Sequence, residues 1–121
     1  ASEVGVFKPE WFPRFEHPDH EGGGSFYRVL DSHGVVRATV DPAECHRFVT
    51  IDPAGTSSER TAEDRGRSPC WSVASVWDYS PQGWLFWRRI VRMHGEFPEV
   101  IRAIRSLYSE ERPQAIWIEV D

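Results

Sequence analysis

The sequence predicts an α/β domain: a mixed sheet, made of an antiparallel meander and a parallel strand after a crossover helix, preceded by a β-hairpin. Three observations support this fold class. Short apolar runs bounded by Pro, Gly and Asp, typical of strands, recur over residues 26–94. From residue 96 the apolar spacing becomes helical, and residues 115–121 are again strand-like. A helix between two strands of one sheet makes a right-handed crossover, so the last strand should lie parallel to an earlier one.

The composition limits the class of protein. The chain has 121 residues, of which 40% are hydrophobic and 27% charged, enough for a modest core. Its net charge of -5 gives no reason to expect nucleic-acid binding over the whole surface. No apolar run reaches the length of a membrane span, and no secretory signal opens the chain. Cys45 and Cys70 are expected to be reduced thiols. We therefore expect a cytoplasmic protein without a membrane partner.

Residues 1–25 are predicted to be a lead-in and linker segment, because residues 6–13 mix aromatics with prolines and residues 22–25 are Gly-Gly-Gly-Ser. The predicted hairpin joins residues 26–30 and 35–40 through a short Gly-containing loop. Residues 41–44 then turn the chain into the next strand.

The strand predicted at residues 48–51 runs into Asp52, which is followed by Pro53, Ala54 and Gly55. A carboxylate at the end of a buried strand is partly shielded but accessible, which suits a hard divalent cation. An Asp before Pro and Gly also commonly starts a turn, so this stretch alone leaves both interpretations open.

Residues 55–69 lack an apolar period and are predicted to form a mobile surface loop. Two antiparallel strands follow at 71–79 and 84–93, the second near a sheet edge because it carries Arg88, Arg89 and Arg92. The helix is predicted to start near Pro98 and to end at Arg112. The expected core consists of Phe48 or Val49, Ile51, Val73, Val76, Ile104, Leu107, Ile116 and Ile118.

Glu119 follows the last strand as Asp52 follows the earlier one. Parallel neighbouring strands end on the same side, so the two carboxylates should meet at one sheet edge. Their expected joint role is to hold Mg²⁺ or Mn²⁺ for attack of water on a phosphodiester. The alternative is that they are unrelated surface acids.

An ordered set of segments resembles the nuclease domain of the large terminase subunit of tailed bacteriophages, which has a ribonuclease H-like fold. The matching segments are residues 48–55, 72–77, 83–89, 100–108 and 112–119, and residues 6–12 resemble the segment that leaves the family's ATPase domain. The resemblance implies that residues 26–121 are a partial ribonuclease H-like nuclease domain. It also implies a metal-dependent endonuclease that cuts concatemeric DNA during genome packaging.

By this resemblance, Asp52 and Glu119 are the catalytic acids and ligands of a two-ion Mg²⁺ or Mn²⁺ site. The implied partners are double-stranded DNA, an ATPase domain, the small terminase subunit and the portal. The family's third acid lies beyond Glu119, on a segment that this sequence does not contain. Asp121 shares a face with Glu119 by strand alternation and is the candidate third ligand. We expect Arg60, Arg65 and Arg67, in the loop, to approach DNA.

Two alternative functions share part of this interpretation. A truncated domain with an incomplete site would cleave DNA weakly or not at all, and would serve as a DNA-binding or assembly module. A nucleotide-binding domain of the actin or sugar-kinase type also begins with a strand-borne Asp and a Gly loop, as at Asp52 and Gly55. Such domains need a second phosphate loop, which this sequence lacks.

Overall fold

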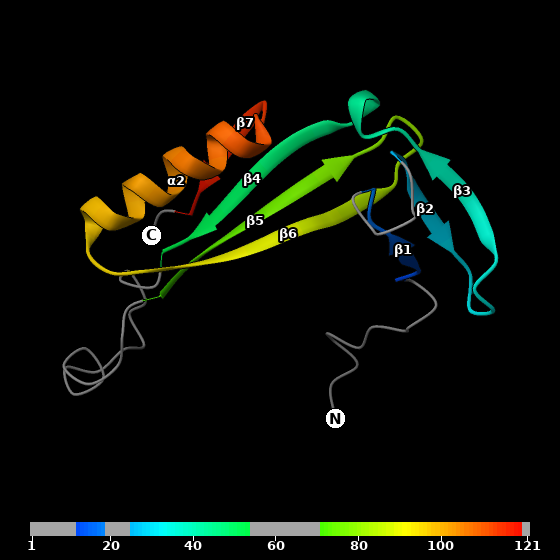
Figure 1. The fold of residues 1–121 in the computed structure, drawn as a ribbon, viewed down its shortest axis with the longest axis horizontal. Helices are drawn as coiled ribbons and strands as arrows, with labels where there is room; N and C mark the ends of the chain where they lie inside the picture. Colours follow the sequence, from blue (N-terminus) through cyan, green and yellow to red (C-terminus); the bar gives the residue numbers. More distant parts are fainter. Residues whose placement is uncertain (1–11, 19–24, 54–70, 120–121) are drawn as a thin grey trace. The chain divides into compact units, whose positions relative to one another are not determined.

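The computed structural model describes residues 12–18, 25–53 and 71–119. The contacts within the chain divide it into two units, residues 1–45 and residues 46–121. The fold is mixed α/β, as predicted: the first unit contains a three-stranded antiparallel sheet, and the second contains a four-stranded mixed sheet with one helix (Figure 1). No helix in the described residues is long and apolar enough to cross a membrane.

In the first unit, β2 (Tyr27–Leu30) and β3 (Val36–Val40) form the predicted antiparallel hairpin. The Asp31 carboxylate closes its turn by accepting hydrogen bonds from the backbone N–H groups of His33 and Val35, at 2.8 and 2.9 Å. The bond from Val35 is the main cause that lowers the pKa of Asp31 below its ordinary value. The short helix η2 (Pro42–Glu44) follows β3.

A third strand of this unit, β1 (Arg14–Glu16), pairs antiparallel with β2 and was not predicted. The strand lies within the segment that we expected to be a lead-in. Three residues are too short to show an alternating apolar pattern, so the sequence carried no signal for it. An ion pair between Arg28 and Glu16 joins the two strands.

The sheet of the second unit has the strand order β6-β5-β4-β7. Its meander consists of β4 (His46–Asp52), β5 (Trp71–Tyr79) and β6 (Leu85–His94), with antiparallel neighbours. The last strand, β7 (Ala115–Ile118), lies parallel to β4 and beside it. The predicted parallel return of the chain is therefore confirmed, as is the position of β6 at a sheet edge.

The helix α2 (Phe97–Glu111) connects β6 to β7 and lies along one face of this sheet (Figure 1). Pro98 stands in its first turn, where a missing N–H costs nothing. The helix ends because Arg112 adopts a left-handed conformation, with φ of 49°, and its N–H donates to the carbonyl of Tyr108. Prediction and structure agree on both ends within a residue or two.

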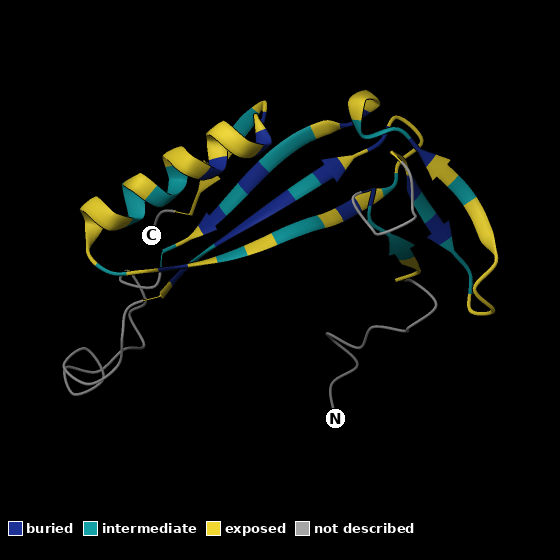
Figure 2. Cartoon of the chain, viewed as in Figure 1, coloured by how far each residue is buried: buried dark blue, intermediate teal, exposed yellow. Residues whose placement is uncertain are grey.

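The core of this unit lies between α2 and the sheet, and buried residues recur along β4 and β5 (Figure 2). Odd-numbered positions of β4 and even-numbered positions of β5 face the helix. Leu107 is the helix residue at the centre of this core, with 4% of its surface exposed. The buried cluster consists of Val49, Ile51, Ala74, Val76, Met93 and Leu107.

Three of the expected core residues, Val73, Ile116 and Ile118, are not in the core. Val73 is half-buried and lies on the opposite face of the sheet, because Ala74 and Val76 on the same strand face the helix. Ile116 and Ile118 are 36% and 54% exposed, so the prediction that they are buried was wrong. Both belong to the edge strand β7, whereas the apolar side of α2 packs on residues of β4, β5 and β6. Alternation predicts which face a side chain occupies, but it does not predict how far a helix covers that face.

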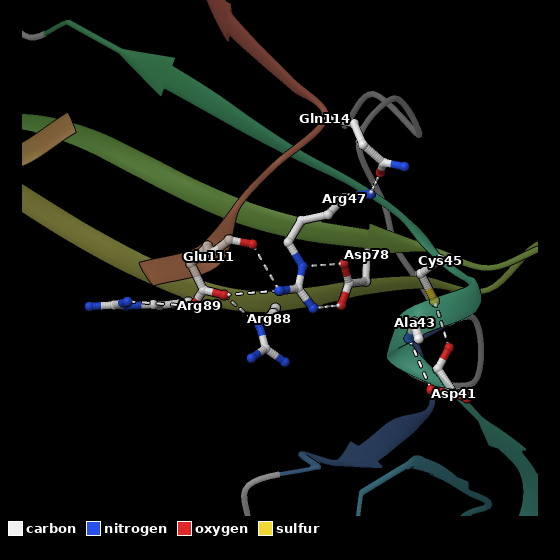
Figure 3. A network of polar contacts seen from close by, with 9 residues as sticks. All are labelled: Asp41, Ala43, Cys45, Arg47, Asp78, Arg88, Arg89, Glu111 and Gln114. Atoms are coloured by element: carbon white, nitrogen blue, oxygen red, sulfur yellow. Dashed lines mark hydrogen bonds and ion pairs between the residues drawn. The ribbon is translucent and has the colours of Figure 1, made fainter. Parts of the chain in front are cut away.

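A network of charged side chains fixes the C-terminal end of α2 to the sheet (Figure 3). Arg47 donates from Nε and Nη2 to the two carboxylate oxygens of Asp78, at 2.7 and 2.8 Å, and Asp78 is fully buried. Arg47 also donates from Nη1 to the carboxylate of Glu111, at 3.2 Å. Its hydrogen bond to Asp78 is the main cause that raises the pKa of Arg47 above its ordinary value. Arg88 and Arg89 complete the network by pairing with Glu111.

Candidate functional site

The structure brings Asp52 and Glu119 to the same edge of the sheet. Asp52 is the last residue of β4, and Glu119 directly follows β7. In the parallel pairing Ile51 lies opposite Ile118, and the N–H of Glu119 donates to the carbonyl of Ile51 at 3.1 Å. Continuing this register by one residue places Glu119 beside Asp52. Both side chains are exposed.

The two acids line one surface cavity of about 570 Å³. Most lining positions of β4 and β5, namely Thr50, Asp52, Val73 and Ser75, alternate with the core positions of the same strands, so the cavity lies mainly on the sheet face that α2 does not cover. Ile51 belongs to the core and also contributes to the lining. Thr50 and Ser75, which are opposite each other on β4 and β5, contribute short side chains to this lining. The remaining lining residues are Trp87, Ile90, Trp117 and Ile118.

Aromatic side chains bound the cavity on the side away from the acids. Phe48, Trp77 and Trp87 are partners across three neighbouring strands, and their rings stack at centroid distances of 6.3 and 5.5 Å. Trp77 Nε1 also donates to the Thr50 hydroxyl at 2.9 Å, which fixes the indole next to the cavity. Each ring therefore packs against a neighbouring ring across the sheet. Trp117 of β7 lines the cavity and is 65% exposed.

The charges of this unit are divided between its two faces. Asp78, Glu110 and Glu111 are engaged with arginines on the helix side of the sheet. Within the described part of the chain, no ion pair is found for Asp52 or Glu119. Carboxylate oxygens that no cation neutralises are the ligands that Mg²⁺ and Mn²⁺ prefer, and such ions keep several water ligands. The donor set therefore fits a divalent metal bound by two carboxylates.

A third acidic ligand is not found in the described residues, which contain no group of three His, Cys, Asp or Glu side chains able to hold a metal. Asp121, the predicted third ligand, lies outside the described residues. The same holds for Arg60, Arg65 and Arg67, which were predicted to approach DNA, and for the predicted loop that carries them.

The sequence predicted that Asp52 and Glu119 lie at one sheet edge, but it did not predict the other residues of the cavity. Trp87, Ile90 and Trp117 were assigned to strands without a site role. The signal that was available is alternation: Thr50 and Asp52 share a face, as do Trp117 and Glu119. What alternation does not predict is that short residues on β4 and β5 leave a hollow between bulky ones on β6 and β7.

Comparisons with protein-family models, with curated protein sequences and with solved structures gave no match.

Proposed function

We propose that this protein is a metal-dependent DNA endonuclease domain with a ribonuclease H-like fold, of the kind found in the large terminase subunit of tailed bacteriophages. It acts on double-stranded DNA in the host cytoplasm, cutting concatemers during genome packaging together with an ATPase domain, the small terminase subunit and the portal. One observation supports the proposal most directly: Asp52 and Glu119 end two neighbouring parallel strands and line one cavity. The segment resemblance supplies the family.

In this proposal Asp52 and Glu119 hold Mg²⁺ or Mn²⁺ at the exposed end of the cavity. When bound, such an ion supplies charge neutralisation at a phosphodiester and a water of lowered pKa. The strands fix both carboxylates, since the ladder between β4 and β7 leaves little freedom for their backbones. Fixed ligands matter, because a displacement of about 1 Å in a catalytic group costs roughly 100-fold in rate.

The test is nicking of supercoiled plasmid in the presence of Mn²⁺. Nicking is expected in the wild type, and Asp52→Asn and Glu119→Gln should each reduce its rate by more than about 100-fold. Such a loss exceeds the 10–100-fold typical for residues that only orient metal ligands. Glu99→Gln is the matched control, because Glu99 is an exposed acid in the first turn of α2 and away from the cavity. Nicking that persists in Asp52→Asn contradicts the proposed site.

Binding of DNA and Mn²⁺ without any nicking would favour the alternative, a catalytically impaired domain that acts as a DNA-binding or assembly module. This alternative follows from the resemblance, because two carboxylates without the family's third acid would hold only one ion, and loosely. The same plasmid assay, paired with a binding measurement, therefore separates the two candidates.

A further inference from the structure

We propose that Arg92 is a DNA-phosphate contact that positions the strand to be cut across the carboxylate pair. The proposal rests on the proposed function and deepens it, because it names how the substrate's backbone is held. Arg92 belongs to β6, the edge strand opposite β7 in the sheet order, so it lies across the sheet from Glu119.

The strand register places Arg92 in the same row as the acids. Asp52 is opposite Val73 on β5, and Val73 is opposite Arg92 on β6. Directly paired residues point to the same face of a sheet, so Arg92 lies on the face that carries Asp52 and the cavity. Met93, the next residue, is buried in the core on the helix side, as this alternation requires.

The three arginines of β6 have different environments. Arg88 and Arg89 pair with Glu111 at the C-terminal end of α2, and these contacts explain their presence in the fold. Arg92 is exposed, and no hydrogen bond or ion pair is found for it among the residues that the structure describes. An arginine on the cavity face with no structural contact is available for a ligand. Its planar group of five N–H donors matches a phosphate.

The distance between Arg92 and the acids suits a DNA strand. Neighbouring strands lie about 4.8 Å apart, so the two intervals from Asp52 to Arg92 span about 10 Å. Phosphates of one DNA strand rise about 3.4 Å each along the helix axis. A DNA strand with one phosphodiester at Asp52 and Glu119 therefore brings a neighbouring phosphate within reach of the Arg92 side chain.

The charges at this edge favour such a contact. Asp52 and Glu119 are both negative, and without a cation they repel the DNA backbone. A bound metal offsets this charge only at the phosphodiester it touches, whereas Arg92 attracts the backbone at a second point. Two contacts, one at the metal and one at Arg92, fix the direction in which a DNA strand crosses the sheet, whereas a single contact does not. A phosphate contact orients DNA without reading its base sequence.

The experiment measures binding of a fluorescein-labelled DNA duplex by anisotropy, with Ca²⁺ in place of Mn²⁺ so that cleavage does not interfere. Arg92→Gln should weaken binding by about 5–10-fold near 50 mM salt and reduce the slope of log K against log salt by about 1. Arg92→Lys should restore most of the affinity, because a point charge still binds phosphate. Arg102→Gln, on an exposed position of α2, should bind as the wild type does.

Cleavage kinetics give a second readout that a purely structural role would not produce. A phosphate contact present in both the bound substrate and the transition state should raise KM in Arg92→Gln and leave kcat nearly unchanged. Equal binding by Arg92→Gln and the wild type overturns the inference, and so does an equal loss in Arg92→Gln and Arg102→Gln. If the wild type cleaves while Arg92→Gln is unaffected, only this inference fails. If the wild type neither binds nor cleaves DNA, the proposed function fails and the inference with it.

Discussion

At the scale of single residues, the acidic side chains of the second unit follow two different rules. Asp78 is fully buried, and Arg47 donates two hydrogen bonds to its carboxylate, as a buried polar group needs. Asp52 and Glu119 are exposed, and no ion pair is found for either among the residues that the structure describes. Asp78 contributes to the stability of the fold, whereas Asp52 and Glu119 are accessible to a ligand from solvent. Burial, which the sequence does not display, separates the two kinds.

This difference predicts the effect of removing Arg47. Arg47→Met should lower the free energy of unfolding by about 3–5 kcal/mol, because the buried Asp78 carboxylate loses the cation that donates two hydrogen bonds to it. The double variant Arg47→Met with Asp78→Leu should be more stable than Arg47→Met alone, because it no longer contains the buried carboxylate. Urea denaturation measures both. A loss below about 1 kcal/mol in Arg47→Met, or a double variant less stable than the single one, would show that the ion pair between Arg47 and Asp78 contributes little to the stability of the fold.

At the scale of elements, the sequence predicted most strands and the helix because their periods are long and clear. The strand at 71–79 and the helix at 97–111 each show several repeats of their period. β1 was missed because three residues show no period. Ile118 was misplaced because coverage of β7 depends on the angle and position of α2, which follow from packing rather than from the β7 sequence.

The packing of α2 predicts a contrast between two substitutions. Leu107→Ala should cost about 2–5 kcal/mol, because Leu107 is 4% exposed and its loss leaves a cavity over the sheet. Ile118→Ala should cost well under half of that, because Ile118 is 54% exposed on the edge strand. Urea denaturation measures both costs, and the two variants can be compared if the free energy of unfolding depends on urea concentration with the same slope. Equal costs for the two would mean that α2 packs on β7 and not mainly on the meander.

At the scale of the whole molecule, topology is what brings the candidate site together. Asp52 and Glu119 are far apart in sequence, and the crossover through α2 makes their strands parallel neighbours. The handedness rule for crossovers allowed this to be predicted from the sequence. The cavity beside the acids was not predictable in the same way, since it depends on the relative sizes of side chains from four strands.

Binding of metal by both acids is the central claim, and diffraction from crystals soaked with Mn²⁺ tests it most directly. Anomalous scattering of Mn²⁺ should give a peak in contact with carboxylate oxygens of both Asp52 and Glu119, with water filling the remaining positions. The peak should disappear in crystals of Glu119→Gln soaked in the same way. Mn²⁺ bound elsewhere with no peak between these two carboxylates, or a peak that persists in Glu119→Gln, would contradict the claim.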